Sequence, residues 1–206
     1  MRAKKKKSSE EDFIRLKLDK AGNKLFESPD FSVWVAYTRM VSKTDADAAI
    51  LTSLTARYGD EALSKMIEGG LRVKSTQEIS TKLQQMQFKY WKELGISSDD
   101  MFTYVLKLDE DINGLLKNPN LNTLAKYVDE LSEADDKLKT PMIDTFRAYY
   151  SDAVLLKMFH TAKNDPKTQK MAESLIASLN DKLRLDRFKK AQLRDMRKAQ
   201  LRNTIS

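Results

Sequence analysis

The feature that most constrains this chain is a repeat inside its own sequence. The tetrapeptide Leu-Lys-Leu-Asp at 16–19 recurs ninety positions later at 106–109. Over residues 16–37, eight of the 22 residues are identical at this offset, whereas unrelated stretches of that length share about one or two. The chain is therefore expected to fold as two copies of one structural unit.

The repeat continues through the second half of each copy at a slightly larger offset. From Ala56 onward the matching residues lie ninety-two positions apart, so the second copy contains two additional residues. A unit of this length is a small helical domain rather than a short solenoid repeat. The residues identical at the second offset are Ala56, Tyr58, Asp60, Leu63, Lys65, Met66, Thr76 and Gln77, paired with Ala148, Tyr150, Asp152, Leu155, Lys157, Met158, Thr168 and Gln169.

Glycine and proline are sparse, and their positions predict where helices begin and end. The chain has six glycines and four prolines in 206 residues, and long stretches without either favour helices over strands. Gly59 and Gly95 interrupt apolar residues spaced three or four apart, as expected where a helix stops. Each proline follows a polar residue at a predicted helix start, where proline is tolerated. These prolines are Pro29, Pro119, Pro141 and Pro166.

Both Leu-Lys-Leu-Asp segments are predicted to be helical. The first predicted helix begins at Ser8 and runs to about Glu27. The second segment falls in a helix that is capped at 97–100 and joins the two copies. We expect Leu106 and Leu108 to be buried in a groove of the first copy, where each stabilises the joint by about 1.5–3 kcal/mol.

These patterns predict an all-α fold in which two tandem helical bundles share a linking helix and a long C-terminal helix follows. The hydrophobic share of 41% is enough to build such cores. The expected organisation is a basic leader over 1–9, a first repeat over 10–96, a divergent second repeat over 97–185 and a basic helical tail over 186–206.

The composition offers little for catalysis or metal binding. There is no cysteine, so disulfides and thiolate metal sites are excluded. The one histidine is His160, and a single histidine on a helix is usually a packed or surface residue. No cofactor is expected. The alternative is a helical enzyme, which requires a deep pocket with polar groups converging near His160.

No segment of the sequence predicts a membrane span. No run approaches the roughly 18 apolar residues that a span needs. The N-terminal residues 1–12 also lack the apolar stretch of a signal peptide. A secreted form would therefore need a leader that is missing from this numbering.

Basic residues concentrate at the two ends of the chain. Residues 182–206 carry nine Lys/Arg and two Asp, and residues 1–7 carry five basic residues and no acid, so the body between them is mildly acidic. That distribution does not describe a general nucleic-acid-binding surface. The N-terminal cluster is either a short nuclear-import signal or a solubilising leader. Its lysines are Lys4, Lys5, Lys6 and Lys7.

The C-terminal tail predicts a helix with one basic face. Lys-Ala-Gln-Leu-Arg occurs at 190–194 and again at 198–202, eight residues on. Eight residues are just over two helical turns, so both copies lie on the same side. One interpretation is that this side binds RNA, an acidic partner or a membrane surface. The other is that the tail is a solvated extension of the last helix. Its basic residues are Arg187, Lys190, Arg194, Arg197, Lys198 and Arg202.

The repeated motifs resemble those of a known family. Around Trp34, at 58–63 and at 16–19, the chain resembles the W, Y and L motifs of the WY/LWY effectors that Phytophthora and related oomycetes deliver into plant cells. The resemblance spans about Asp12 to Leu185. The family's translocation motif, Arg-x-Leu-Arg, is absent, so the chain resembles the mature portion of such an effector.

The resemblance implies a structural role for four residues. In that family a tryptophan and a tyrosine stack inside a helical bundle, which implies that Trp34 and Tyr58 form this pair in the first repeat. In the second repeat Leu124 stands in place of the tryptophan, while Tyr150 keeps its position. The second core is therefore expected to be aliphatic at this point.

The resemblance further implies a secreted, non-catalytic effector that enters a host plant cell, acts in its cytoplasm or nucleus and binds host proteins to suppress immunity. The alternative is a nuclear RNA- or nucleic-acid-associated factor, for example a suppressor of host RNA silencing, that uses the basic tail. The sequence leaves the host target and the oligomeric state open.

Overall fold

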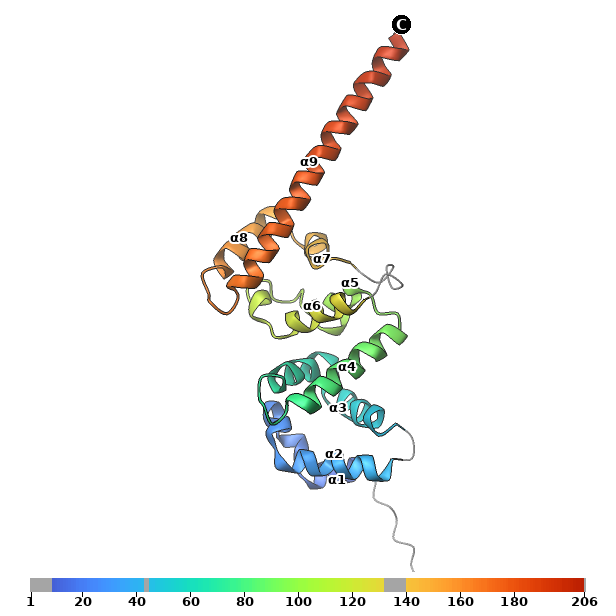
Figure 1. Ribbon diagram of the computed structural model, residues 1–206, viewed down its shortest axis with the longest axis vertical. Helices are drawn as coiled ribbons and strands as arrows, with labels where there is room; N and C mark the ends of the chain where they lie inside the picture. Colours follow the sequence, from blue (N-terminus) through green and yellow to red (C-terminus); the bar gives the residue numbers. More distant parts are fainter. Residues whose placement is uncertain (1–8, 43–44, 132–139, 206) are drawn as a thin grey trace, which may run out of the picture. The chain divides into compact units, whose positions relative to one another are not determined.

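The computed structural model describes residues 9–42, 45–131 and 140–205, without the side chains of Ser9, Asn23 and 202–205. Every regular element in these ranges is a helix (Figure 1). The predicted all-α class is therefore confirmed, and so is the long C-terminal helix.

The described residues form two compact units. Unit 1 contains the residues up to Asp111 and those from Asn118 to Thr140, and unit 2 contains Ile112–Lys117 and the residues from Pro141 onward. The domain boundary predicted at 96/97 follows the sequence repeat rather than these packing contacts, and it stays a prediction.

Unit 1 contains most of the helices of the described chain. Its α-helices are α1 (Ser9–Arg15), α2 (Pro29–Val41), α3 (Ala46–Gly70), α4 (Gln77–Glu93), α5 (Ser98–Asp100) and α6 (Asn120–Glu130). Its other helical turns are the 3-10 helices η1 (Leu18–Lys20) and η2 (Gly22–Glu27) and the π-helix η3 (Met101–Val105). Unit 2 contains the 3-10 helix η4 (Leu115–Lys117), α7 (Met142–Tyr149), α8 (Asp152–Ala162) and α9 (Gln169–Ile205).

An aromatic cluster lies in the core of unit 1. Trp34 of α2 is fully buried, and its ring meets Phe13 of α1 edge-on with the centroids 4.9 Å apart. The Phe31 ring lies 5.8 Å from that of Trp34. Edge-to-face pairs of this kind add to the free energy of burial. The aliphatic residues that complete the core are Leu18, Leu25, Ile50, Leu54, Leu63, Ile67 and Leu83.

Each Leu-Lys-Leu-Asp segment interrupts the helical run at its lysine, so the prediction that each lies within one continuous helix was wrong. α1 ends at Arg15 rather than near Glu27, and Lys17 has a left-handed backbone with φ of 57°. In the second copy η3 ends at Val105, and Lys107 is left-handed with φ of 49°. Because the same uncommon conformation recurs at matching positions, the repeat is a repeat of backbone structure as well as of sequence.

This turn buries the leucines that flank its lysine. Leu106 and Leu108 belong to unit 1 and are 0% and 1% exposed. The Leu108 N–H donates to the Phe102 carbonyl at 2.8 Å, which closes the turn around Lys107. The expected burial of both leucines is therefore observed, although they follow a helix instead of lying on it. Their role between the two repeats stays a prediction.

The turns that precede α4 and α9 are held by the same hydrogen bond. The Thr76 hydroxyl donates to the Gly70 carbonyl at 2.8 Å, and the Thr168 hydroxyl donates to the Ala162 carbonyl at 2.7 Å. These carbonyls lie at helix ends, where no partner within the helix is available to them. The identical threonines thus preserve one helix–turn–helix geometry in both units.

The helix break predicted at Gly59 is present in both copies in different forms. Gly59 has φ of 73° and ψ of 164°, so it interrupts α3 without ending it. Ser151 stands at the matching position, between α7 and α8, where its side chain accepts the Val154 N–H at 3.4 Å. The bent helix α3 therefore corresponds to α7 and α8 together, and α4 corresponds to the start of α9.

Helix α6 comes from the second sequence repeat but packs against α3 and α4 of unit 1. The Asn120 side chain donates to the Glu61 carbonyl at 3.0 Å. The Tyr127 hydroxyl donates to the Ile96 carbonyl at 2.7 Å, and its ring packs edge-on against Trp91 at 5.9 Å. Unit 1 is therefore completed by a helix that lies about fifty residues further along the chain than α3.

This contact includes an ion pair whose carboxylate is buried, while its lysine is partly exposed. The Glu68 side chain is 4% exposed, and its Oε1 accepts from Lys126 Nζ at 2.7 Å. The same oxygen accepts from Gln84 at 2.7 Å and from Thr123 at 3.3 Å. A buried carboxylate is tolerated only when it is paired and hydrogen-bonded. This requirement fixes the register of α6 on α3 and α4.

The left-handed turn can be tested at Lys107. We expect Lys107→Val to lower the free energy of unfolding by about 1–2 kcal/mol, because a β-branched residue resists positive φ. Lys107→Gly should not destabilise the protein, since glycine adopts this conformation freely. Urea unfolding followed by circular dichroism measures both.

A matched control is Lys89→Val on the exposed side of α4, which should cost only about 0.5 kcal/mol of helix propensity. If Lys107→Val costs no more than this control, the turn does not require the left-handed conformation.

Candidate interaction surfaces

The residues that resemble the W and Y motifs of the first repeat lie in the core of unit 1. Trp34 is fully buried against Phe13 and Phe31. Tyr58 packs at the edge of the same core, and its hydroxyl donates to the Leu18 carbonyl at 3.1 Å. Partial burial raises the pKa of the Tyr58 hydroxyl. Both residues are thus placed to support the fold, and their stacking as a pair stays a prediction.

The matching residues of the second repeat lie in different units. Leu124 is buried on α6 in unit 1. Tyr150 is half-buried just after α7 in unit 2, with its ring 6.5 Å from that of Tyr149. The expected aliphatic substitution is therefore accommodated in a packed position.

The single histidine lies on the surface. His160 is exposed near the end of α8. Within residues 9–42, 45–131 and 140–205, no group of three or more His, Asp or Glu side chains could hold a metal ion.

Burial raises the pKa of the Asp60 carboxyl, while the hydrogen bond from the Trp91 indole at 3.1 Å lowers it. That hydrogen bond connects α3 to α4, which is a structural role.

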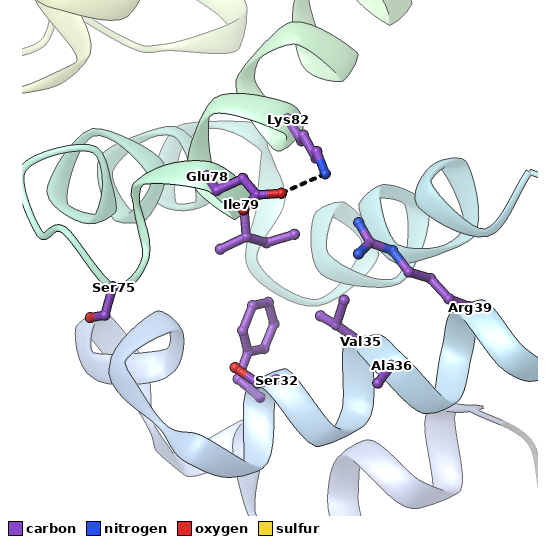
Figure 2. Close-up of a pocket in the computed structure, with 9 residues that line it drawn as sticks. Ser32, Val35, Ala36, Arg39, Ser75, Glu78, Ile79 and Lys82 are labelled. Carbon is purple, nitrogen blue, oxygen red and sulfur yellow. Dashed lines mark hydrogen bonds and ion pairs between the residues drawn. The ribbon is translucent and has the colours of Figure 1, made fainter.

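A groove opens between α2 and α4 of unit 1 (Figure 2). Its apolar floor includes Phe31, Val35 and Ile79. Figure 2 shows Val35 and Ile79 facing one another across the floor, with Arg39 on one side and the Glu78–Lys82 pair on the other. The remaining residues that line the groove are Ser32, Ala36 and Ser75.

The groove combines an apolar floor with a charged rim. Lys82 Nζ donates to Glu78 at 2.8 Å, and this bond holds the pKa of the Glu78 carboxyl below its usual value. Such exposed pairs contribute little to stability. The groove holds about 230 Å³, which is below the volume of a typical small-molecule site.

The first turns of α9 are anchored in unit 2. Arg147 of α7 bonds Asp152 of α8 at 2.8 Å and Asp186 of α9 at 2.7 Å. The hydrogen bond from Arg147 lowers the pKa of Asp186. Lys182 also bonds Asp144 at 2.5 Å. The buried residues on this part of α9 are Ala172, Leu175 and Leu179.

Beyond Asp186, α9 continues as an exposed helix past α7 and α8 (Figure 1). Leu185, Phe188 and Met196 are 45%, 60% and 55% exposed and share one side of the helix. The basic residues predicted from the sequence lie on the opposite side, whereas Lys189 lies on the apolar side, so the two sides are only partly separated. Those predicted from the sequence and exposed in the structure are Arg187, Lys190, Arg194, Arg197 and Lys198.

Two of the predicted basic features cannot be placed. Lys4, Lys5, Lys6 and Lys7 lie outside the described residues, as does the side chain of Arg202.

Among the described helices, none combines the length and the apolar character needed to span a bilayer.

Known proteins were compared with the chain by family model and by sequence. No family model matches. The chain is 37% identical over 174 residues to RxLR effector protein PSR2 of Phytophthora sojae. The aligned region covers 84% of this chain and 26% of that protein. It is 34% identical over 173 residues to PSR2 of Phytophthora infestans, which covers 83% of this chain and 22% of that protein.

A solved structure agrees with the sequence comparison. The crystal structure of PcRxLR12 matches with a TM-score of 0.70 and 32% identity over 84% of this chain and 42% of that chain. The chain belongs to the RxLR effector family. This RxLR chain spans about a quarter of the length of the PSR2 proteins that it matches.

Sequence reasoning did not find the groove or the Glu68–Lys126 ion pair of this effector. The groove joins helices whose lining residues are about forty positions apart, and its apolar residues look like ordinary core residues while its charged ones look solvated. Glu68 and Lys126 are separated by 58 positions, and no local pattern connects them. The basic side of α9 was found because its periodicity is local.

Proposed function

We propose that this RxLR chain acts inside host plant cells, where its helical body binds host proteins and thereby suppresses immunity. The observation that supports this best is the groove between α2 and α4. It has an apolar floor for an anchoring side chain and rim charges that orient a partner, as protein-binding surfaces do.

A non-catalytic role fits the same surface. The groove has Arg39, Glu78 and Lys82 at its rim, and its lining includes two serines, Ser32 and Ser75, but no histidine that could act as their base. Effector relatives and an all-helical fold point in the same direction.

The site of action belongs to this proposal too. RxLR effector relatives support secretion by the pathogen followed by entry into the host cell. Action in the cytoplasm is compatible with the groove alone, whereas action in the nucleus requires Lys4–Lys7 to work as an import signal.

The WY/LWY assignment completes the proposal. The W/Y core positions would be Trp34 and Tyr58 in the first repeat and Leu124 and Tyr150 in the second. Their support is the burial of Trp34 and Leu124 and the left-handed turn that recurs within each L motif.

The groove can be tested by filling it in the full chain. Ser32→Arg places a long charged side chain over the floor without disturbing the core, because Ser32 is exposed. We expect pull-downs from plant extract to lose at least one host protein that the wild-type chain captures, with a drop of about tenfold or more.

The matched control is Thr81→Arg, which adds the same side chain to the side of α4 away from the groove. It should retain the wild-type set of partners. Equal capture by both variants and the wild type would contradict a role for the groove.

A second candidate function is supported by the exposed basic side of α9. Arg194, Arg197 and Lys190 project from a helix that is free of neighbours within unit 2 along this stretch. A basic helix of this kind can neutralise phosphates of a single-stranded RNA.

Fluorescence anisotropy with a labelled single-stranded RNA tests this function at several salt concentrations. If three phosphates are contacted, the logarithm of the binding constant should fall with that of the salt concentration with a slope of about −2. Changing Lys190, Arg194 and Arg197 to Glu should then abolish binding.

The control changes the same net charge elsewhere, through Lys20→Glu, Lys24→Glu and Lys74→Glu on the exposed surface of unit 1. RNA binding that is weakened equally by both triple variants would show a net-charge effect and reject α9 as the site.

A further inference from the structure

We propose that unit 1 binds an arginine side chain of a partner protein in a pocket between α3 and α4, with Asp60 as the counter-charge. This pocket shares no lining residue with the groove between α2 and α4, so it is a separate surface. The chemistry of its occupant follows from the matching place in unit 2, where the chain supplies an arginine of its own.

The pocket holds about 260 Å³ and is lined by Leu51, Thr52, Thr55 and Ala56 of α3 and by Tyr90 of α4. The elements that precede and follow these two helices in the sequence, α1, α2, α5 and α6, all belong to unit 1. The pocket therefore stays open although its neighbours on both sides along the chain are present.

The sequence repeat identifies the matching place in unit 2. Leu51 and Leu83 match Ile143 and Leu175 at the offset of ninety-two, and all four side chains are buried. The two helix pairs therefore correspond residue by residue. At this offset, Thr52, Thr55, Asp60, Tyr90 and Leu94 match Asp144, Arg147, Asp152, Lys182 and Asp186.

Unit 2 carries a cation at the position of Thr55. Arg147 Nε donates to Asp152 Oδ1 at 2.8 Å, and Arg147 Nη2 donates to Asp186 at 2.7 Å. Asp152 stands at the position of Asp60. In this repeat a guanidinium beside position 55 thus reaches the carboxylate at position 60.

A second cation of unit 2 is replaced by an aromatic ring in unit 1. Lys182, which bonds Asp144 at 2.5 Å, matches Tyr90, and Asp144 matches Thr52. Both members of that ion pair are therefore neutral in unit 1. The Tyr90 side chain is 48% exposed beside the pocket, and the face of such a ring attracts a guanidinium.

The carboxylate of the arrangement is kept in unit 1 without its cation. Asp60 is half-buried, and its Oδ1 accepts a hydrogen bond from the Trp91 indole at 3.1 Å. Within the described ranges, no lysine or arginine forms an ion pair with Asp60. Burial raises the pKa of its carboxyl, because desolvation disfavours the charged form, and a bound cation would offset that cost.

These features favour arginine over lysine. A planar guanidinium can bond a carboxylate and stack on an aromatic ring at the same time, whereas an ammonium is a compact, strongly hydrated charge. The pocket offers both groups, through Asp60 and Tyr90.

The surroundings of the pocket favour a protein as the source of the arginine. Leu94 follows Tyr90 by four residues at the end of α4 and is 57% exposed, so the two lie on the same side of the helix. Apolar residues beside the arginine of a partner can be buried there. Tyrosine and arginine are also the residue types that contribute most to binding in protein interfaces.

The capped peptide acetyl-Leu-Arg-Leu-amide tests the pocket when it is titrated into the full chain and followed by amide NMR shifts. We expect saturable shifts at Thr55, Asp60 and Tyr90 with a dissociation constant of about 1 mM. The same peptide with citrulline, which keeps the shape of arginine without its charge, should bind about tenfold more weakly. Free arginine should also bind about tenfold more weakly, because it lacks the apolar neighbours.

Two variants alter the pocket in opposite ways. Asp60→Asn removes the counter-charge but keeps an oxygen for the Trp91 indole, so peptide binding should weaken about tenfold. Thr55→Arg supplies the guanidinium that Arg147 supplies in unit 2, so peptide binding should be lost. The midpoint of thermal unfolding should rise by about 2–4 °C in Thr55→Arg, and the rise should vanish when Asp60→Asn is added.

Two control variants place an arginine elsewhere on unit 1. Thr81→Arg lies on the exposed surface of α4 away from the pocket, so it should bind the peptide as wild type and gain no comparable stability. Ser32→Arg fills the separate groove and should also leave peptide binding unchanged. Failure of the groove and failure of this pocket are thereby distinguished.

Arginine binding in this pocket is contradicted if the peptide gives no saturable shifts up to about 10 mM, or if the citrulline peptide binds equally well. It is contradicted equally if Asp60→Asn binds as tightly as wild type, or if Thr55→Arg gains no more stability than Thr81→Arg. If free arginine binds as tightly as the peptide, the pocket is not a docking site for a partner protein.

Discussion

The packing of α6 on α3 and α4 determines how the rest of the chain is organised. A carboxylate at 4% exposure, that of Glu68, requires a cation and hydrogen-bond donors, and α6 supplies both through Lys126 and Thr123. A helix of the second sequence repeat is thus an integral part of unit 1, and the physical unit and the sequence repeat do not coincide.

Much of the fold could be predicted because its signals are local or repeated. Pro29 begins α2 and Gly59 interrupts α3, as their backbone preferences require. The Leu-Lys-Leu-Asp turns could not be predicted, since leucine and lysine favour helices and nothing in the sequence marks Lys17 or Lys107 for positive φ. Tertiary packing of the flanking leucines overrides that preference. A backbone feature of this kind becomes visible only when the two copies are compared in three dimensions.

The candidate surfaces also differ in whether they could be predicted from the sequence. The basic side of α9 follows from an eight-residue spacing and was predictable. The groove between α2 and α4 was not, because its floor joins Val35 to Ile79 from different helices and its rim residues look like solvated ones. The effector has a groove with an apolar floor and a charged rim on unit 1 and an exposed basic helix on unit 2.

Native-state hydrogen exchange of the full chain tests most directly whether α6 belongs to unit 1. The amides of α6 around Leu124 should open together with those of α3 and α4, with the same free energy and the same dependence on denaturant, because one cooperative core contains all three helices. If the α6 amides instead exchange freely while α3 and α4 stay protected, or open in step with α8 and α9, then α6 does not complete unit 1 and the Glu68–Lys126 pair does not organise the fold.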